Sequence, residues 1–318
     1  MRSVDLIYVS EYHFGTHFCA NIGITKNQRA VSGSWGGYAL TEWATLIREA
    51  ADERPEPLIA TAILDVWPQR GSTPFKVTAT DGNQYVAKGL WRGRDRGRAI
   101  AIDYIVSRLG QLLGAPVAEV AIINVPDDMV AGCSELTGMV PGPVRGSHWI
   151  DGCRDFRREL ADCDFDSNQQ ELALIALMFG WVVDDNMLGD VHFLCCGSAP
   201  RKIVSMDHDV FWQSLPFWND TRERLFEPDK VLATVWSPGP ARPNMPILRH
   251  LRGDKHVSTI PEIPILREAL EGVTELEVAN VIALVPDEWG ITPSVQIELA
   301  NYLWMRRDDL LQWCLGPR

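Results

Sequence analysis

The sequence lacks the features typical of a membrane protein or of a secreted protein held by disulfides. No stretch approaches the roughly 20 apolar residues of a membrane-spanning helix. The beginning of the chain lacks the basic and then apolar pattern of a signal peptide. The seven cysteines follow no regular framework and include no C-x-x-C pair, which argues against a disulfide scaffold and against a structural zinc site. We therefore expect a reducing, cytoplasmic setting.

The chain also has fewer basic than acidic residues, with 30 Lys and Arg against 42 Asp and Glu. The formal net charge is −12, so a nucleic-acid backbone is not expected as a general partner. The one arginine cluster, RGRDRGR, spaces its arginines two positions apart, which does not line one face of a helix, and we interpret it as a charged loop. What the chain does have is 318 residues, of which 46% are hydrophobic, enough for one large or two modest domains.

The middle of the chain has a β-rich pattern. Residues 1–57 contain a predicted helix near Leu40–Ala51 and a linker near Pro55–Pro57, and they form an N-terminal extension of unclear role. Five strands are then predicted, at LIATAILDVW, FKVTAT, QYVAKGL, PVAEVAIINV and ELTGMVP. Asp81-Gly82 predicts a tight hairpin between the second and third strands. The apolar spacing of IAIDYIVSRLGQLL predicts a helix that ends at Gly114.

Past the Pro/Gly-rich segment VPGPVRGS, which we interpret as a hinge, the pattern becomes mainly helical. A capping box S-x-x-Q at Ser167 opens the apolar segment ELALIALMFGWVV, and a second box, T-x-x-E, stands at Thr274. Thr292-Pro293 is an N-cap followed by Pro, and it predicts the start of a long terminal helix. The expected fold class is α+β with two lobes, a small β-rich lobe at residues 58–143 and a larger helical lobe at 144–318.

The segment WVVDDNMLGDVHFL carries several acids and is followed by two β-rich runs around the turn CGSAP. These runs predict a hairpin. If its turn is centred between Ser198 and Ala199, Asp190 and Asp207 lie opposite each other, with Cβ atoms about 5 Å apart. Two carboxylates this close favour a cation between them, and Mg²⁺ is the natural candidate. Asp185 precedes Asp190 by five positions.

This order of acids matches the arrangement of catalytic residues in protein kinases. There the first Asp accepts the proton of the substrate hydroxyl, and the later residues hold the metals that bridge the ATP phosphates. A kinase also needs a lysine on the third strand of the sheet lobe, and Lys88 stands there in QYVAK. The segment QRGSTP lies between the first two strands, where the phosphate-covering loop belongs.

Several ordered motifs resemble the HipA-like kinase family over roughly residues 58–318. They are GSTPFKVTATDGNQYVAKG, the helix with Asp103, LLGAPVAEVAII, DDNMLGD and VSMDHDVFW. The resemblance implies a protein-kinase-like or phosphoinositide-kinase-like fold. It implies ATP- and Mg²⁺-dependent phosphoryl transfer to an alcohol group, on Ser or Thr of a protein substrate. It also leaves room for a regulatory protein partner.

The resemblance implies a role for each matching residue. Lys88 would bind the α/β-phosphates with Asp103 as its acidic partner. Asp185 would be the catalytic base, and Asp190 and Asp207 would be the metal ligands. The residues implied to cover the phosphates are Gly71, Ser72 and Thr73.

The chain departs from the family pattern, and other functions stay open. Asn186 stands where Arg is common, Asp190 where Asn is common, and Asp103 where Glu is common. These differences leave open a catalytically impaired pseudokinase that binds nucleotide as an interaction module. A metal-dependent phosphohydrolase is a third hypothesis, with the candidate residues Asp185, Asp190, His192, Asp207, His208 and Asp209. It does not explain Lys88, and His208 is more readily interpreted as a hydrogen-bonding residue that orients the loop.

Overall fold

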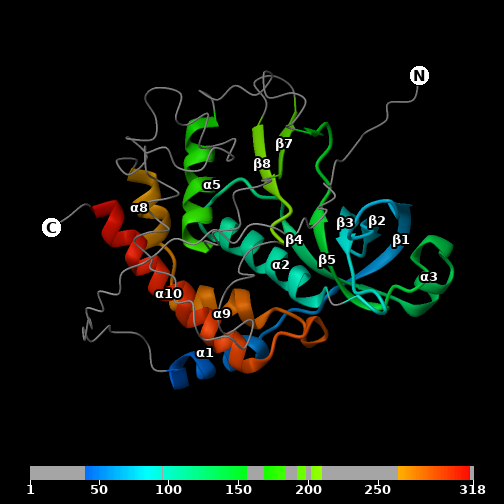
Figure 1. Cartoon of the computed structure of the whole chain (residues 1–318), viewed down its shortest axis with the longest axis horizontal. Helices are drawn as coiled ribbons and strands as arrows, with labels where there is room; N and C mark the ends of the chain where they lie inside the picture. The colour runs from blue at the N-terminus through cyan, green and yellow to red at the C-terminus, as the bar shows by residue number, and fades with distance from the viewer. Residues whose placement is uncertain are drawn as a thin grey trace, which may run out of the picture.

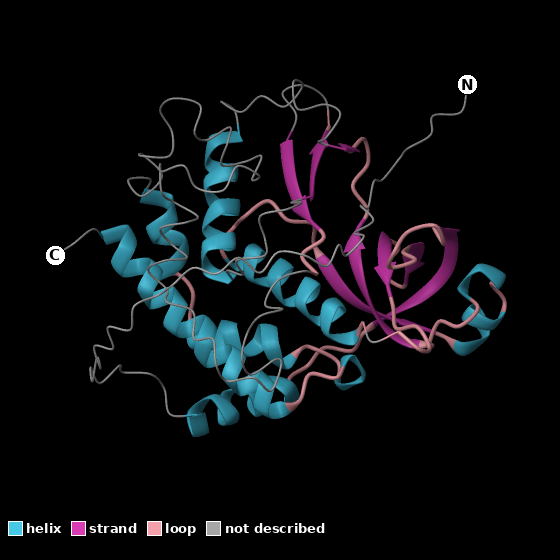
Figure 2. Cartoon of the chain, viewed as in Figure 1, coloured by secondary structure: helices cyan, strands magenta, loops and turns pink. Residues whose placement is uncertain are grey.

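The computed structural model describes residues 40–94, 96–155, 168–182, 192–197, 202–209 and 264–315. Within these residues, a closed five-stranded barrel lies beside a group of helices (Figures 1 and 2). Around the barrel the strands follow the order β1-β2-β3-β5-β4. Their bounds are β1 (Leu58–Val66), β2 (Phe75–Ala79), β3 (Gln84–Lys88), β4 (Val120–Val125) and β5 (Gly142–His148). The architecture is mixed α and β.

The β2–β3 hairpin forms as the sequence predicts. Gly82 adopts a φ of 81° in the turn, and its N–H donates to the carbonyl oxygen of Ala79 at 2.9 Å. A positive φ of this kind is readily adopted by glycine. The register pairs Phe75 with Ala87, so Lys88 lies at the end of β3 that neighbours the β1–β2 loop.

The strand predicted at ELTGMVP is wrong. That segment contains the end of the short helix η1 (Ser134–Leu136) and turns, whereas the fifth strand, β5, begins within the segment interpreted as a hinge. β5 pairs with both β3 and β4, so the sheet continues past residue 143. The glycine at position 146 has a packing role within the strand. A Cβ there would lie 2.5 Å from Cδ1 of Ile123, so a larger residue would not fit between the strands.

Most of the helices gather on the side of the barrel where α2 lies, and α2 lies between the barrel and α5, α8, α9 and α10 (Figure 1). Their bounds are α1 (Leu40–Asp52), α2 (Gly97–Leu112), α3 (Asp127–Ala131), α5 (Gln169–Val182), α8 (Pro264–Glu271), α9 (Glu275–Ala283), η6 (Asp287–Trp289) and α10 (Pro293–Leu315). α3 lies at the far side of the barrel, together with η1 (Figures 1 and 2). The predicted end of α2 at Gly114 is confirmed, and this glycine has a φ of 69°. The predicted capping box of Thr274 is also confirmed, at the start of α9. α10 begins at Pro293 as predicted. None of the described helices is long and apolar enough to cross a membrane.

Buried apolar side chains form two separate clusters. The first fills the barrel and includes Phe75, Val77, Ala87, Ile123 and Val144. The second joins the helices and includes Trp43, Ile105, Leu109, Met178, Val281 and Leu303. The rings of Trp43 of α1 and Trp304 of α10 pack edge to face, with their centroids 6.3 Å apart. Arg54 donates to the carbonyl oxygens of Ala283 and Val285, the latter at 3.3 Å, so residues 40–54 are attached to the helical cluster.

A second sheet of three short strands follows the barrel along the chain. It has the order β6-β7-β8, with β6 (Arg154–Asp155), β7 (His192–Cys196) and β8 (Lys202–Met206). The predicted β7–β8 hairpin is confirmed, but its register differs by one residue. His192 lies opposite Met206, whereas the predicted register requires Ser205. A one-residue shift moves side chains to the other face. The register from which the opposition of Asp190 and Asp207 was predicted is therefore wrong within the hairpin, and Asp190 itself lies outside the described residues.

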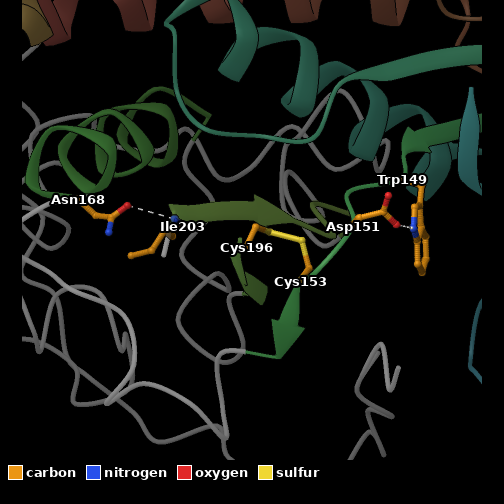
Figure 3. The surroundings of a disulfide bond; sticks show 6 residues. All are labelled: Trp149, Asp151, Cys153, Asn168, Cys196 and Ile203. Carbon is orange, nitrogen blue, oxygen red and sulfur yellow. Dashed lines mark hydrogen bonds between the residues drawn. A yellow bond between two sulfur atoms is a disulfide. The ribbon is translucent and has the colours of Figure 1, made fainter. Parts of the chain in front are cut away.

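Two contacts hold the β7–β8 hairpin close to its turn (Figure 3). Cys153 forms a disulfide with Cys196, which the cysteine pattern did not predict. The two lie opposite each other because the β6–β7 register pairs Arg154 with Cys195. On the other strand, the backbone N–H of Ile203 donates to Oδ1 of Asn168 at 3.1 Å.

Candidate functional site

The candidate site is built around Lys88, whose side chain is 8% exposed. The neighbouring Ala87 belongs to the barrel core, so strand alternation turns Lys88 outward, toward α2. The Lys88 ammonium donates to Oδ2 of Asp103 at 3.1 Å and also to Oδ1 of Asp207. Oδ2 of Asp209 lies 3.6 Å from the same nitrogen. Three carboxylates therefore converge on one ammonium group.

Arg145 brings a second cation to this cluster. It is paired with Lys88 across β3 and β5, so the two side chains leave the sheet on the same face. Nη2 of Arg145 lies 3.0 Å from Oδ1 of Asp103 and donates to Oγ of Ser107 at 3.2 Å. Asp103 and Ser107 are one turn apart on α2, so this face of the helix is joined to the sheet by polar contacts. The sequence prediction missed Arg145 because it placed the residue in the hinge.

The turn after β8 brings Asp207 to Lys88. Asp207 has a φ of 63°, a left-handed conformation in which Asp is enriched among non-glycine residues. Directly after it, the backbone N–H of His208 donates to Oδ1 of Asp103 at 3.0 Å. β8 is itself fixed, because the N–H of Ser205 donates to the carbonyl oxygen of Pro116 at 2.7 Å. The turn is thus held by contacts with α2 and with the segment before β4.

His208 fixes the same turn through its side chain. It is 1% exposed, with Nδ1 3.1 Å from Oγ of Ser107 and Nε2 2.9 Å from Oγ of Ser205. Burial lowers the pKa of His208 to about 4 against the opposing effect of Asp103, so the ring is neutral near pH 7. The interpretation of His208 as a hydrogen-bonding residue is confirmed. Because both ring nitrogens contact hydroxyls, the ring is not placed to serve as the metal ligand that the phosphohydrolase hypothesis requires.

The charges of the cluster stabilise one another. Burial would lower the pKa of Lys88, but Asp103, Asp207 and Asp209 raise it above the usual value. Burial would raise the pKa of Asp103, but Arg145 and Lys88 hold it well below its usual range. Burial raises the pKa of Asp209 to about 6, with Lys88 opposing and Asp207 and Asp103 adding to the effect. The pKa of Asp209 stays raised although Lys88 and Arg96 oppose the rise, so its negative charge is incompletely compensated and would be stabilised by a further cation.

The carboxylates of Asp207 and Asp209 fit the donor chemistry of Mg²⁺. This ion takes oxygen ligands and needs only one or two carboxylates when phosphate oxygens and water complete its octahedron. Within the described ranges, no group of three or more His, Cys, Asp or Glu is placed to hold a metal ion by itself. Of the two predicted metal ligands, Asp207 belongs to the cluster and Asp190 lies outside the described residues.

The predicted phosphate loop, Gly71, Ser72 and Thr73, joins β1 to β2 at the end of the sheet where Lys88 lies. Thr73 has a φ of 48°, which is a strained conformation for a β-branched residue. Oγ of Ser72 is buried and has no hydrogen-bond partner in the part of the chain that the structure describes. Arg94 donates to Oγ1 of Thr73 at 3.4 Å. Backbone strain together with an unsatisfied buried hydroxyl favours a functional loop.

The structure thus brings together Lys88, Asp103 and Asp207 from three distant segments, and it adds Asp209 and Arg145. The sequence prediction gave Asp209 no part in the kinase site, although its position two residues after Asp207 was a usable signal. The predicted catalytic base Asp185 and its neighbour Asn186 lie outside the described residues, so their roles stay predictions.

Comparison with known proteins agrees with the predicted resemblance. The model of the HipA-like kinase family matches residues 61–214, which confirms the resemblance over this part of the chain and supports a kinase. No curated protein matches the chain. Among solved structures, the crystal structure of the proinflammatory kinase CtkA of Helicobacter pylori is similar, with a TM-score of 0.43 and 12% identity, covering 82% of this chain and 100% of that one.

Proposed function

We propose that the chain is an ATP- and Mg²⁺-dependent kinase that phosphorylates Ser or Thr hydroxyls of a protein substrate. The observation that carries this proposal is the buried contact of Lys88 with Asp103 of α2 and with Asp207 after β8. Phosphoryl transfer requires chiefly positioning and charge neutralisation. A lysine and carboxylates that are held in place by Arg145 and His208 suit both requirements.

Each residue has a separate task in the proposed reaction. Lys88 binds the α/β-phosphates and keeps its ion pair with Asp103. Asp207, with Asp190 as a further proposed ligand, would hold Mg²⁺, and the ion would supply positive charge to neutralise the phosphates. Asp185 accepts the proton of the acceptor hydroxyl. The loop residues proposed to cover the phosphates are Gly71, Ser72 and Thr73.

The proposal extends to the organisation of the chain. The barrel would form the nucleotide-binding lobe of a protein-kinase-like fold, predicted at residues 58–143 and extended by β5 to His148, and the catalytic lobe predicted at 144–318 would follow it. Residues 1–57 would precede both as an extension. A cytoplasmic setting and a regulatory protein partner are part of the same proposal. The Cys153–Cys196 disulfide gives a direct check on the setting, because a reducing compartment would keep both thiols free.

A pseudokinase is the second candidate, and one observation favours it. The ammonium of Lys88 is surrounded by three carboxylates, so a phosphate must displace at least one of them to bind. Asp207→Asn, which removes one of these charges, should then improve nucleotide binding in a pseudokinase. In the kinase it should abolish transfer, because Asp207 is needed for Mg²⁺.

Transfer of ³²P from labelled ATP to casein and to the chain itself tests the proposal. Wild type should transfer phosphate only when Mg²⁺ is present, and Lys88→Met, Asp185→Asn and Asp207→Asn should each abolish transfer. Lys202→Met is the matched control, because Lys202 is exposed and pairs with Glu171 away from the cluster. A rise in melting temperature with Mg-ATP, without transfer and unchanged by Asp185→Asn, would select the pseudokinase. Absence of both nucleotide binding and transfer would contradict the two candidates.

A further inference from the structure

A cavity lies on another face of α2, beside the one that contacts the Lys88 cluster. It has a volume of about 520 Å³ and is bordered by α2, β4, the segment between α1 and β1, and the loop that follows α9. This volume is within the usual range for small-molecule sites. Asp103 and Ser107 of α2 contact the Lys88 cluster, whereas the residues that follow each of them, Tyr104 and Arg108, line the cavity.

The cavity has an apolar wall and a cationic end. The apolar wall is formed by residues that include Pro55, Pro57, Val120, Ile122 and Leu284. Arg54 and Arg108 are half-buried, and both lie close enough to Tyr104 to counteract the rise in its pKa that burial causes. Glu56 and Glu288 also line the cavity, but they are exposed, so water and salt screen their charges more strongly. The half-buried cations therefore dominate the potential inside.

Tyr104 and Arg108 carry hydrogen-bond donors at the cationic end that a ligand could use. Within the described residues, the Tyr104 hydroxyl makes no hydrogen bond, although its ring is 3% exposed and packs edge-on against Trp289 at 5.8 Å. Arg108 makes one side-chain hydrogen bond in the same part of the chain, from Nη1 to Oε1 of Gln111 at 3.0 Å. That contact orients the guanidinium group and leaves other donors of this five-donor group for a ligand.

We propose that this cavity binds a compact anion with an apolar body, of the class of aromatic carboxylates. Its carboxylate would accept hydrogen bonds from Tyr104 and Arg108, and its ring would pack against the apolar wall. An occupant would contact the helix that holds Asp103 against Lys88, so its binding is coupled to nucleotide binding at the candidate site. Binding in the cavity does not depend on the proposed kinase function; only the coupling rests on it.

Calorimetry with 2-naphthoate tests the site on the full chain without nucleotide. We expect binding with a Kd of about 1 mM or tighter, as the size of the ligand allows. The isosteric neutral 2-naphthamide should bind about tenfold more weakly, since a charge-assisted hydrogen bond is lost. The Arg108→Gln substitution should weaken the binding of 2-naphthoate by a similar factor for the same reason. Arg267→Gln is the control, because Arg267 is exposed on α8 and pairs with Glu271.

Asn124→Trp separates this cavity from any other site. Asn124 of β4 lines the cavity, is exposed, and lies on the same face of the strand as Val120 and Ile122, so an indole there would occupy the space without changing a charge. The variant should lose 2-naphthoate binding while its melting temperature stays within a few degrees of wild type. No binding of 2-naphthoate to wild type, equal binding of the acid and the amide, or full binding to a folded Asn124→Trp variant would each overturn the proposal.

The coupling is measured as the affinity for the Mg²⁺ complex of AMP-PNP with and without saturating 2-naphthoate. We expect a change of about fivefold or more, and an equal effect of the nucleotide on 2-naphthoate, because coupling free energies are reciprocal. If 2-naphthoate binds and the nucleotide does not, the cavity site stands and the proposed kinase is contradicted. If both bind independently, the coupling through α2 is wrong.

Discussion

Asp103 and Tyr104 are neighbours on α2, and their exposed fractions are 0% and 3%. Asp103 has its charge matched by Lys88 and Arg145 and accepts a backbone hydrogen bond from His208. The Tyr104 hydroxyl has no hydrogen bond within the described residues and lines a cavity. One side of the helix is therefore a closed polar network, and the other is open to a ligand.

The difference between these two sides shows that burial alone does not indicate how a residue contributes. A buried charge that loses its partner leaves the remaining charge in a low-dielectric setting, which costs several kcal/mol. A buried ring that keeps its packing and loses an unbonded hydroxyl changes little. Substitutions along α2 should therefore differ widely in effect although the positions are adjacent.

The largest effect is expected for Lys88→Met on the polar side. Three carboxylates lose the cation between them, so phosphate transfer should fall by at least about a thousandfold if positioned charge carries catalysis. The free energy of unfolding should also fall by about 3 kcal/mol in urea titrations. Lys202→Met should match wild type in both measurements. Transfer at wild-type rates by Lys88→Met would remove the polar side from the catalytic account.

Asp103→Asn should come next, with a loss of stability of similar size that needs no activity to detect. The neutral amide leaves Lys88 and Arg145 facing each other without the carboxylate between them, and we expect about 3 kcal/mol less stability. Asp52→Asn is the control, because Asp52 is exposed at the end of α1, and it should stay within about 0.5 kcal/mol of wild type. Equal urea midpoints for the two variants would contradict the network.

Gly110→Ala probes the part of α2 that packs against the helical cluster. Alanine normally stabilises a helix interior by about 1 kcal/mol relative to glycine. Here a Cβ would lie 2.5 Å from Sδ of Met178 and 2.9 Å from Cγ1 of Val117, so we expect a loss of about 1–3 kcal/mol in thermal or urea unfolding. The Met178→Ala background should remove part of this loss, because the two sites share one contact. A more stable Gly110→Ala variant would show that the packing is looser than described.

Tyr104→Phe should have the smallest effect, and it sharpens the comparison with Asp103. The ring and its contact with Trp289 are kept, and the hydroxyl has no hydrogen bond within the described residues to lose. Stability should stay within about 0.5 kcal/mol of wild type, and nucleotide affinity should be unchanged when no cavity ligand is added. A loss as large as that of Asp103→Asn would mean that the cavity side is also a closed network.

Local signals in the sequence were sufficient for elements that depend on local chemistry. The Asp81-Gly82 hairpin, the Gly114 helix end and the Thr274 capping box follow from the backbone preferences of a few adjacent residues, and all are confirmed. The order of the motifs also predicted correctly that Lys88 and Asp207 lie close together. In the structure Lys88 ends β3 and contacts Asp103 of α2, and Asp207 follows β8.

Features set by long-range packing could not be predicted in this way. β5 was missed because glycine and proline indicate a hinge locally, whereas Gly146 is required by the side chain of Ile123 from the neighbouring strand. Arg145 was missed with it. The β7–β8 register was predicted one residue out, since the turn composition alone does not fix the pairing. The Cys153–Cys196 disulfide depends on that same register and on the neighbouring strand β6.

The most direct test of the Lys88 cluster is calorimetric titration of AMP-PNP with and without Mg²⁺, comparing wild type with Asp207→Asn. The account predicts that Mg²⁺ tightens binding to wild type by tenfold or more and has no such effect on the folded Asp207→Asn variant. An equal effect of Mg²⁺ on both proteins would contradict the account, because the ion would then be held without the carboxylate that contacts Lys88.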